Sequence, residues 1–492
     1  MSDRPRIPTD GVSHDRVLAT MRDFRAGDAD WRNGRTFSLV YFAGEEHHQL
    51  LQDASLLYFA ENALNPLAFR SLKRMEAEVV QMSASMLHGP EGCVGTLTTG
   101  GTESILMAVK AARDLARSER PWIRRPEIVA PTTIHAAFDK AAHYFGLKLR
   151  RVPLGDDYEV DVDALRKAIN RNTVLIAASA PQYPHGVLDP IEAIGAIAEE
   201  RGIPFHVDAC IGGFVLPWIE RLGYPIAPFD FRVRGVTSMS ADLHKYGFAA
   251  KGASVVLYRE MKYLRHQFFV ATDWPGGIYA SPSMTGTRAA GPIAAAWASL
   301  MAMGEAGFLE HTRIAMEATK RLREGIERID GLRVLGEPVA TIVAYTTTTD
   351  EVDLYAVADA LQRRGWSVDR QQSPPSLHCT VTSNHAPVIE DYLRDLAASV
   401  DEVRGKSASS AGGTAAMYGM MAKVPVRGLV RRSVLKVMEQ LYGTSIEPPD
   451  PATLRQGGTG MMDVLLAKHG DKIGAVLDRL DRARTKLRGG RR

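Results

Sequence analysis

Residues 70–310 alternate regularly between helical patterns and short apolar segments, and this alternation fits few folds other than a layered α/β body. The apolar segments include "PEIVAP", "TVLIAASAP", "IPFHVDA" and "GASVVLY". Their length and their β-branched residues are typical of buried strands, and the stretches between them have apolar residues at helical spacing. Strands that alternate with helices form a mostly parallel sheet covered by helices. The sequence therefore predicts an α/β large domain at residues 71–310.

The pattern changes after residue 310. A helical stretch is followed by "ATIVAYTTT", by a helix at "DLYAVADALQRRG", by the short segments "SVDRQQ" and "SLHCTVT", and by a last helix at "PVIEDYLRDLAASV". This order predicts a small α+β C-terminal domain at residues 311–404. The Gly/Ser/Ala-rich segment "GKSASSAGGTAA" begins a linker and a helical tail at residues 405–492, in which apolar residues recur at helical spacing over 473–487.

Composition excludes several classes of protein. The 492 residues include 60 Lys and Arg and 57 Asp and Glu, so nucleic acid is not an expected partner. Cys93, Cys210 and Cys379 are too few and too scattered for a disulfide framework or a metal site. The uncharged apolar stretch at residues 289–304 is shorter than the roughly 20 residues that span a bilayer, and the N-terminus has no apolar signal core. We expect a soluble, cytoplasmic protein without a transmembrane anchor or a metal.

Two glycines and a threonine precede an apolar helical pattern in "TTGGTESILMAVKAARDLARS", so a helix is expected to begin near Thr102. Because Gly100 and Gly101 have no side chains, an anion can approach the first N–H groups, where the helix dipole favours negative charge. Taken alone, such a segment is more often an ordinary helix N-terminus than a phosphate site.

Asp208 and Lys245 each follow an apolar segment. Asp208 ends "IPFHVDA" before a Gly-Gly turn, at the edge of an α/β sheet where ligands bind, although it can equally cap a helix. Lys245 lies in "SADLHKYGFAAKG". A lysine there can extend to solvent, but a desolvated lysine has a lowered pKa and acts as a nucleophilic amine.

Together these features match the requirements of pyridoxal 5'-phosphate. The cofactor needs a lysine for its aldehyde (Lys245), an acid for its ring nitrogen (Asp208) and anchors for its phosphate. His135, at an expected strand-to-helix junction in "PTTIHAAFDKAAHYFG", is the candidate that stacks on the ring; its alternative role is a capping histidine. The sequence therefore predicts a pyridoxal phosphate enzyme.

The segments "TTGGTESI", "APQYPHGVLDP", "HVDACIGGF", "FDFRVRGVTSMSADLHKYGFAAKGAS", "QFFVATDWPGGIYASP" and "GTRAAG" resemble, in order and spacing, the sphingosine-1-phosphate lyases. The resemblance runs from about Trp31 to about Thr444. It implies a fold type I, aspartate-aminotransferase-like large domain, and a homodimer with shared active sites to which residues 1–70 contribute. It also implies retro-aldol cleavage of sphingosine 1-phosphate and related phosphorylated long-chain bases to phosphoethanolamine and a long-chain aldehyde.

The same resemblance assigns roles to individual residues. Lys245 is the lysine joined to the cofactor, Asp208 pairs with its ring nitrogen and His135 stacks on its ring. The residues implied to hold the cofactor phosphate are Gly101, Thr102, Ser240 and His244, with Gly276 and Gly277 from the partner chain. The substrate phosphate is implied to bind Tyr41, Lys251 and Thr287. Tyr183 is the candidate general base, and a buried tyrosine that makes one hydrogen bond is an equally good interpretation.

One segment departs from the family. Where the family usually has "NPLHPD", this chain has "ENALNPLAFRSLKRME" and lacks the histidine near Ala68 that contributes to the substrate phosphate pocket. His47 and His48 are candidate replacements. Two other functions remain open: an amino-acid α-decarboxylase on the same fold, and a catalytically silent binding protein. A decarboxylase has no use for Tyr41, Lys251 and Thr287 around a second phosphate.

Overall fold

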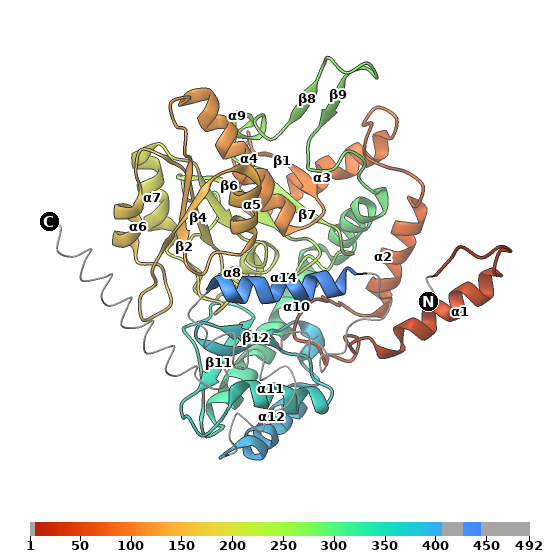
Figure 1. Cartoon of the computed structure of the whole chain (residues 1–492), viewed down its shortest axis with the longest axis vertical. Coiled ribbons are helices and arrows are strands. Elements are labelled where there is room, and N and C mark those ends of the chain that lie inside the picture. Colours follow the sequence, from red (N-terminus) through yellow and green to blue (C-terminus); the bar gives the residue numbers. More distant parts are fainter. Residues whose placement is uncertain (1–4, 406–426, 444–492) are drawn as a thin grey trace.

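The computed structural model of the chain describes residues 5–405 and 427–443, with a large domain above a small one in Figure 1. Most of the expected tail, including the apolar positions over 473–487, lies outside these residues; helix α14 (Arg427–Leu441) is described. The N-terminal segment contains α1 (His14–Phe24), the 3-10 turn η1 (Arg25–Gly27) and α2 (Glu45–Leu57).

The large domain is built on a seven-stranded sheet in the order β1-β7-β6-β5-β4-β2-β3. Neighbours from β3 to β6 pair in parallel, and β7 is antiparallel to both β1 and β6, so the sheet is mostly parallel as predicted. The strands are β1 (Val94–Thr98), β2 (Glu127–Pro131), β3 (Lys148–Val152), β4 (Thr173–Ser179), β5 (Phe205–Asp208), β6 (Val236–Ala241) and β7 (Ser254–Tyr258).

Helices cover both faces of this sheet, which is why its central strands are apolar along their whole length. On β4, Ile176 and Ala178 face one core while Leu175 and Ala177 face the other. The second core also contains residues of α4 and α5, and the first contains residues of α3 and α7. The helices of this domain are α3 (Arg70–Met86), α4 (Gly101–Glu119), α5 (Ala137–Phe145), α6 (Val162–Ala168), α7 (Ile191–Arg201), η2 (Gly212–Phe214), α8 (Leu216–Arg221) and α9 (Met261–Leu264).

The small domain is a four-stranded antiparallel sheet in the order β10-β11-β13-β12, packed against helices. Helix α10 (Ala290–Glu327) crosses the expected domain boundary at residue 310 and bends at Gly304, and its C-terminal half contributes Leu322 and Ile326 to the small-domain core. The remaining elements are β10 (Leu332–Val334), β11 (Ile342–Thr347), α11 (Leu354–Arg363), β12 (Asp369–Gln372), β13 (Pro375–Thr380), η3 (Ser383–His385) and α12 (Ile389–Val403).

The chain before α2 is fastened to the small domain. Thr36 forms a parallel bridge with Ser367, and the fully buried Phe37 stacks on His385 at a ring distance of 4.6 Å. This anchor fixes the residues that follow, 38–41, between the two domains.

A two-stranded hairpin, β8 (Phe269–Ala271) and β9 (Tyr279–Ser281), projects from the large domain at the top of Figure 1. Its tip contains Gly276 and Gly277. Large apolar side chains lie exposed along it, with Trp274 59% and Ile278 80% exposed.

Among residues 5–405 and 427–443, α10 is the one helix long and apolar enough to cross a membrane, and 33% of its most apolar window is buried inside the fold. It contacts α2, α3 and α8 and bends at Gly304. Packing between these helices accounts for the part of the apolar window that is buried.

The buried ion pair between Glu76 and Arg288 allows a test of what holds the large domain together. Arg288 Nη1 and Nη2 donate to the two carboxylate oxygens of Glu76 at 2.6 and 3.1 Å, and Glu76 also accepts from the Leu97 N–H of β1. Removing one partner leaves a buried charge unpaired, so Arg288→Met should lower the free energy of unfolding by about 3–5 kcal/mol in chemical denaturation.

The matched control is the exposed pair of Arg74 and Glu78 on the same helix. Arg74→Met should leave the denaturation midpoint nearly unchanged, because solvent screens an exposed pair. Equal effects of the two substitutions would show that the buried pair has no special role.

Candidate active site

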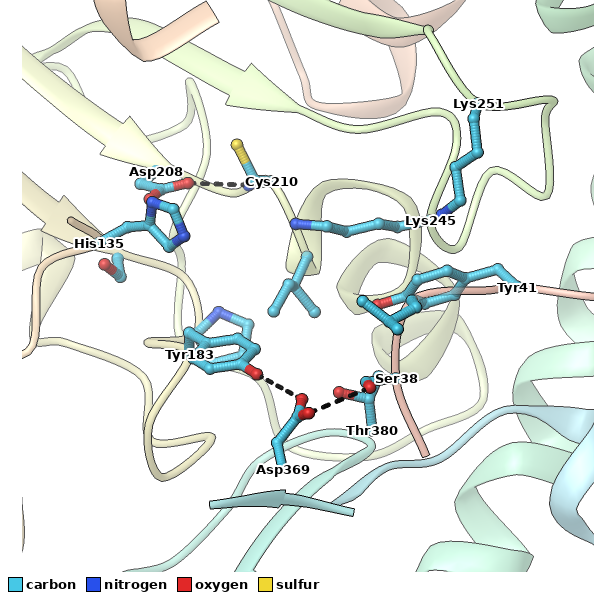
Figure 2. A pocket seen from close by; sticks show the side chains of 14 residues that line it. Ser38, Tyr41, His135, Tyr183, Asp208, Cys210, Lys245, Lys251, Asp369 and Thr380 are labelled. Atoms are coloured by element: carbon cyan, nitrogen blue, oxygen red, sulfur yellow. Dashed lines mark hydrogen bonds between the residues drawn. The ribbon is translucent and has the colours of Figure 1, made fainter. Parts of the chain in front are cut away.

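A cavity of about 340 Å³ lies at the carboxyl ends of β4 and β5, between the large domain, the small domain and the N-terminal segment (Figure 2). Ligands of open α/β sheets bind at this edge. The cavity brings together six of the predicted site residues: Tyr41, His135, Tyr183, Asp208, Lys245 and Lys251. Residues that the sequence did not indicate also line it, among them Ser38, Cys210, Asp369 and Thr380.

Two hydrogen bonds fix the position of the Asp208 carboxylate. Its Oδ1 accepts hydrogen bonds from the Cys210 N–H at 3.1 Å and from the Ser240 hydroxyl at 3.4 Å. The Ser240 hydroxyl also contacts His206 Nε2 at 3.2 Å, and burial lowers the pKa of His206 to about 4, so this histidine is neutral at physiological pH. The fully buried Ser240 thus lies behind Asp208 and not on the cavity wall, and its predicted contact with the cofactor phosphate has no support from this geometry.

His135 makes the local hydrogen bond expected of a capping histidine, and its stacking on the cofactor ring stays a prediction. Its Nδ1 accepts a hydrogen bond from the Ala137 N–H at 3.1 Å, which fixes the ring at the start of α5. The ring lines the cavity and stands edge-on to Tyr183, with 6.5 Å between centroids. A flat group bound beside Asp208 would therefore meet an oriented imidazole.

Lys245 differs from the sequence-based expectation in one respect. Its Nζ lies 2.9 Å from Oδ2 of Asp242, a carboxylate that is itself only 2% exposed. Burial acts to lower the pKa of Lys245, but Asp242, Cys210 and Tyr41 raise it, and the net pKa is above the ordinary value. The expected lowered pKa is therefore wrong for the free chain, because a buried anion touches the amine.

The start of α4 forms a recess without side chains. A Cβ on Gly101 would lie 2.6 Å from Cys210 Sγ and 2.8 Å from Asp242 Oδ2, and a Cβ on Gly100 would lie 3.2 Å from the His244 ring. The helix begins at Gly101, and Thr102 is exposed beside it. Only glycine fits at Gly101, so the first N–H groups, with His244 opposite, can approach an anion such as the cofactor phosphate. The residues present fit pyridoxal phosphate.

Lys251 and Tyr41 meet on one wall of the cavity. Lys251 Nζ lies 5.1 Å from the centre of the Tyr41 ring and donates to the His244 carbonyl at 3.2 Å. Burial, together with the charge of Lys245, lowers the pKa of Lys251 to about 8, and burial raises the pKa of Tyr41 to about 12. This wall is the cationic part of the cavity that lies away from Asp208.

Tyr183 is bonded to a residue of the small domain. Its hydroxyl donates to Asp369 Oδ2 at 2.9 Å, and the Ser38 hydroxyl donates to Asp369 Oδ1 at 3.3 Å (Figure 2). Burial, and then the charge of Asp369, raise the pKa of Tyr183 above its usual range. Asp369 could have been suspected from the sequence only as a charged residue inside the expected strand "SVDRQQ".

The remaining predicted residues lie elsewhere in the single chain. Gly276 and Gly277 are on the projecting hairpin, and Thr287 is exposed just after it; none of the three lines the cavity. His47 Nε2 contacts the Phe248 carbonyl and the Ser299 hydroxyl, and His48 contacts Gln52, so neither histidine reaches the cavity.

The two cavity lysines should differ in reactivity in the cofactor-free chain. Near pH 8, Lys251 is about half neutral, whereas Lys245 is protonated by its contact with Asp242. Reductive methylation followed by peptide mass spectrometry should therefore label Lys251 at least about tenfold faster than Lys245, since one pKa unit changes the neutral fraction about tenfold.

In Asp242→Asn, burial becomes the main influence on Lys245 and its labelling should accelerate. The exposed Lys148 serves as the reference, with the same labelling rate in both proteins. Unchanged labelling of Lys245 in Asp242→Asn would contradict this account.

Comparison with known proteins agrees with the site. Residues 29–348 match the family model "Pyridoxal-dependent decarboxylase conserved domain". The chain is 44% identical over 444 residues to the curated sphingosine-1-phosphate lyase of Arabidopsis thaliana, covering 89% of this chain and 81% of the relative. It is 43% identical over 451 residues to sphingosine-1-phosphate lyase 1 of Rattus norvegicus, covering 91% and 78%.

Solved structures agree as well, and they confirm the predicted fold. The sphingosine-1-phosphate lyase of Burkholderia pseudomallei has a TM-score of 0.81 and 38% identity, covering 89% of this chain and 97% of that one. A glutamate decarboxylase of Lactobacillus brevis, at 21% identity and a TM-score of 0.73 over 82% of this chain and 96% of that one, shares the fold. The chain thus belongs to the sphingosine-1-phosphate lyases, within the pyridoxal-dependent decarboxylase family.

Proposed function

We propose that this protein cleaves sphingosine 1-phosphate and related phosphorylated long-chain bases between C2 and C3, giving phosphoethanolamine and a long-chain aldehyde. The main support is a single cavity that has Lys245, Asp208 and His135 on one side and the cationic wall of Lys251 and Tyr41 on another. Relatives named sphingosine-1-phosphate lyase, 38–44% identical over about nine-tenths of the chain, support the same activity.

Pyridoxal 5'-phosphate is the cofactor of this family. Lys245 would hold its aldehyde carbon, Asp208 its ring nitrogen and His135 its face, while Gly101, Thr102 and His244 would hold its phosphate. When bound, the cofactor supplies an electron sink for the electron pair released as a bond to the substrate's C2 breaks.

The chain's own residues then select and orient the substrate. Asp208 is a buried carboxylate fixed by Cys210 and Ser240, so it can keep a proton on the ring nitrogen. Lys251, in its protonated form, and Tyr41 would bind the substrate phosphate. With both phosphates bound, C2 and C3 of the substrate would lie near Tyr183, whose hydroxyl is the group available to the C3 oxygen.

The α-decarboxylase alternative uses the same Lys245, Asp208 and His135. It gives no role to Lys251 beside the half-buried Tyr41 at the far wall, and the relatives at high coverage carry the lyase name. The lyase reaction is therefore the better-supported one.

The assembly we propose is a homodimer in which Gly276, Gly277 and Thr287 serve the partner's site. The hairpin that contains the two glycines projects from the body and exposes Val270, Trp274 and Ile278, as an element that packs on a second copy would. In this arrangement the two glycines and Thr287 would contribute to the partner's cavity, which explains why they do not line the cavity of their own chain.

The direct test is incubation of the holoenzyme and of Lys245→Ala with sphingosine 1-phosphate, with mass spectrometry of the products. We expect phosphoethanolamine and the long-chain aldehyde from the unmodified protein only. Release of carbon dioxide from an amino acid, with no aldehyde from sphingosine 1-phosphate, would instead establish the decarboxylase.

The cationic wall predicts a pH dependence for phosphate binding. Lys251 binds a phosphate dianion in its protonated form, so affinity should hold below the pKa of about 8 and fall as pH rises through it, approaching tenfold per pH unit. Calorimetric titration of the holoenzyme with glycerol 3-phosphate, from about pH 7 to about pH 9.5, measures this change. Glycerol 3-phosphate has no amine of its own to titrate.

Lys251→Arg is the control, because a guanidinium stays charged throughout this range. Its affinity should be nearly independent of pH. An equal decline in the variant and the unmodified protein would exclude Lys251 as the cause.

A further inference from the structure

Asp369 makes the contact in the cavity that the predicted roles leave unexplained. It begins β12 of the small domain, yet its carboxylate accepts hydrogen bonds from Tyr183 of the large domain and Ser38 of the N-terminal segment (Figure 2). All three side chains line the cavity. A carboxylate that joins three segments at a cavity wall is a group at which a proton can be held.

Tyr183 cannot act as a base by itself in this setting. Its pKa is raised by burial and by the neighbouring carboxylate, so the phenol is neutral. A neutral phenol can take a proton from a substrate hydroxyl only if it gives its own proton away in the same step. Its hydroxyl already points at an acceptor, Asp369 Oδ2, 2.9 Å away.

The carboxylate of Asp369 accepts hydrogen bonds from two neutral hydroxyl groups, those of Tyr183 and Ser38. Within residues 5–405 and 427–443, no ion pair joins Asp369 to a lysine, arginine or histidine. Its partner across the strands is His378, which burial keeps neutral by lowering its pKa to about 4, and His378 Nε2 lies 2.9 Å from the Tyr183 carbonyl. The charge of Asp369 also contributes to the raised pKa of Tyr41 and of Cys379.

The other candidates for the acceptor are already engaged. Lys245 is tied to Asp242 in the free chain and would be joined to the cofactor in the holoenzyme. Lys251 is assigned to the substrate phosphate, which it would bind in its protonated form, and in that form it cannot accept a proton.

We propose that Asp369 is the terminal proton acceptor for the C3 hydroxyl of the substrate and acts through Tyr183; this rests on the proposed lyase function. The O–H bond at C3 breaks as a new O–H bond forms on Tyr183 Oη, and the original Oη–H proton passes to Asp369 Oδ2. The electron pair left on the C3 oxygen would form the aldehyde C=O as the C2–C3 bond breaks, and the cofactor, when bound, would supply the sink for the electron pair of that bond. The proton held by Asp369 balances the one that C2 takes up, so the cycle closes.

The first test replaces Asp369 with Asn, which keeps an oxygen for the Tyr183 hydroxyl but accepts no proton. In the holoenzyme, Asp369→Asn should lower kcat about 10²- to 10⁴-fold while KM and the visible absorbance of the bound cofactor stay unchanged. The matched control is Asp395→Asn, since Asp395 is a small-domain carboxylate that accepts a hydrogen bond from Trp366 and does not line the cavity. It should keep the kcat of the unmodified protein.

Three further measurements separate proton transfer from a merely structural role. Formate added to Asp369→Ala should restore part of kcat, because it supplies a small carboxylate at the vacated position. Tyr183→Phe should lose as much kcat as Asp369→Asn, and the double variant should be no worse than either single one. Infrared difference spectra should show a carboxylic-acid C=O band on mixing the holoenzyme with substrate, and Asp369→Asn should lack it.

The outcomes distinguish this inference from the proposed function. If the unmodified protein releases no aldehyde, the lyase function fails and the relay fails with it. If the unmodified protein is active and Asp369→Asn keeps kcat within about threefold, or the losses of the two single variants multiply in the double variant, the relay alone is overturned. If Asp369→Asn does not fold, Tyr183→Phe and the infrared band of the unmodified protein still decide the question.

Discussion

The ion pair between Lys245 and Asp242 determines the electrostatics of the whole cavity. A buried carboxylate such as that of Asp242 is costly unless it is paired, and Lys245 Nζ pairs with it at 2.9 Å. The pair affects two neighbouring parts of the cavity, Lys251 and the start of α4. The charge of Lys245 helps to lower the pKa of Lys251, and the carboxylate of Asp242 lies against Gly101 at the start of α4. Any group that takes Lys245 from Asp242 therefore changes the charge beside Lys251 and beside the start of α4.

The fold and the large-domain half of the site could be predicted from the sequence because their signals are local. Apolar segments of strand length predicted the sheet, and Asp208 and Lys245 follow such segments directly. The direction of the Lys245 pKa could not be predicted in this way, because it depends on whether a carboxylate touches the amine. The contact predicted between Ser240 and the cofactor phosphate stays a prediction. Ser238 and Ser240 alternate onto the same face of β6 and both contact His206, away from the cavity.

The small-domain half of the site has no local signal. Tyr183 and Asp369 are 186 residues apart, and Ser38 and Asp369 are 331 apart. What brings them together is packing far from the cavity: Phe37 is fully buried in the small-domain core, and the next residue is Ser38. The sequence shows that Phe37 is apolar. It does not show whether the side chain packs in the core of the large domain or in the core of the small domain. The contacts that complete the cavity are therefore tertiary, and the structure is needed to see them.

The charges around Tyr183 connect these two halves. Asp369 raises the pKa of Tyr183 and Lys245 lowers it, so the phenol lies between an anion of the small domain and a cation of the large domain. In the free chain the ammonium of Lys245 opposes transfer of a proton toward Tyr183. A carbonyl joined to Lys245 would change that opposing charge. In the proposed mechanism, formation of the cofactor site and activation of Tyr183 as a proton carrier would be coupled through Lys245, because both domains and the N-terminal segment surround the same cavity.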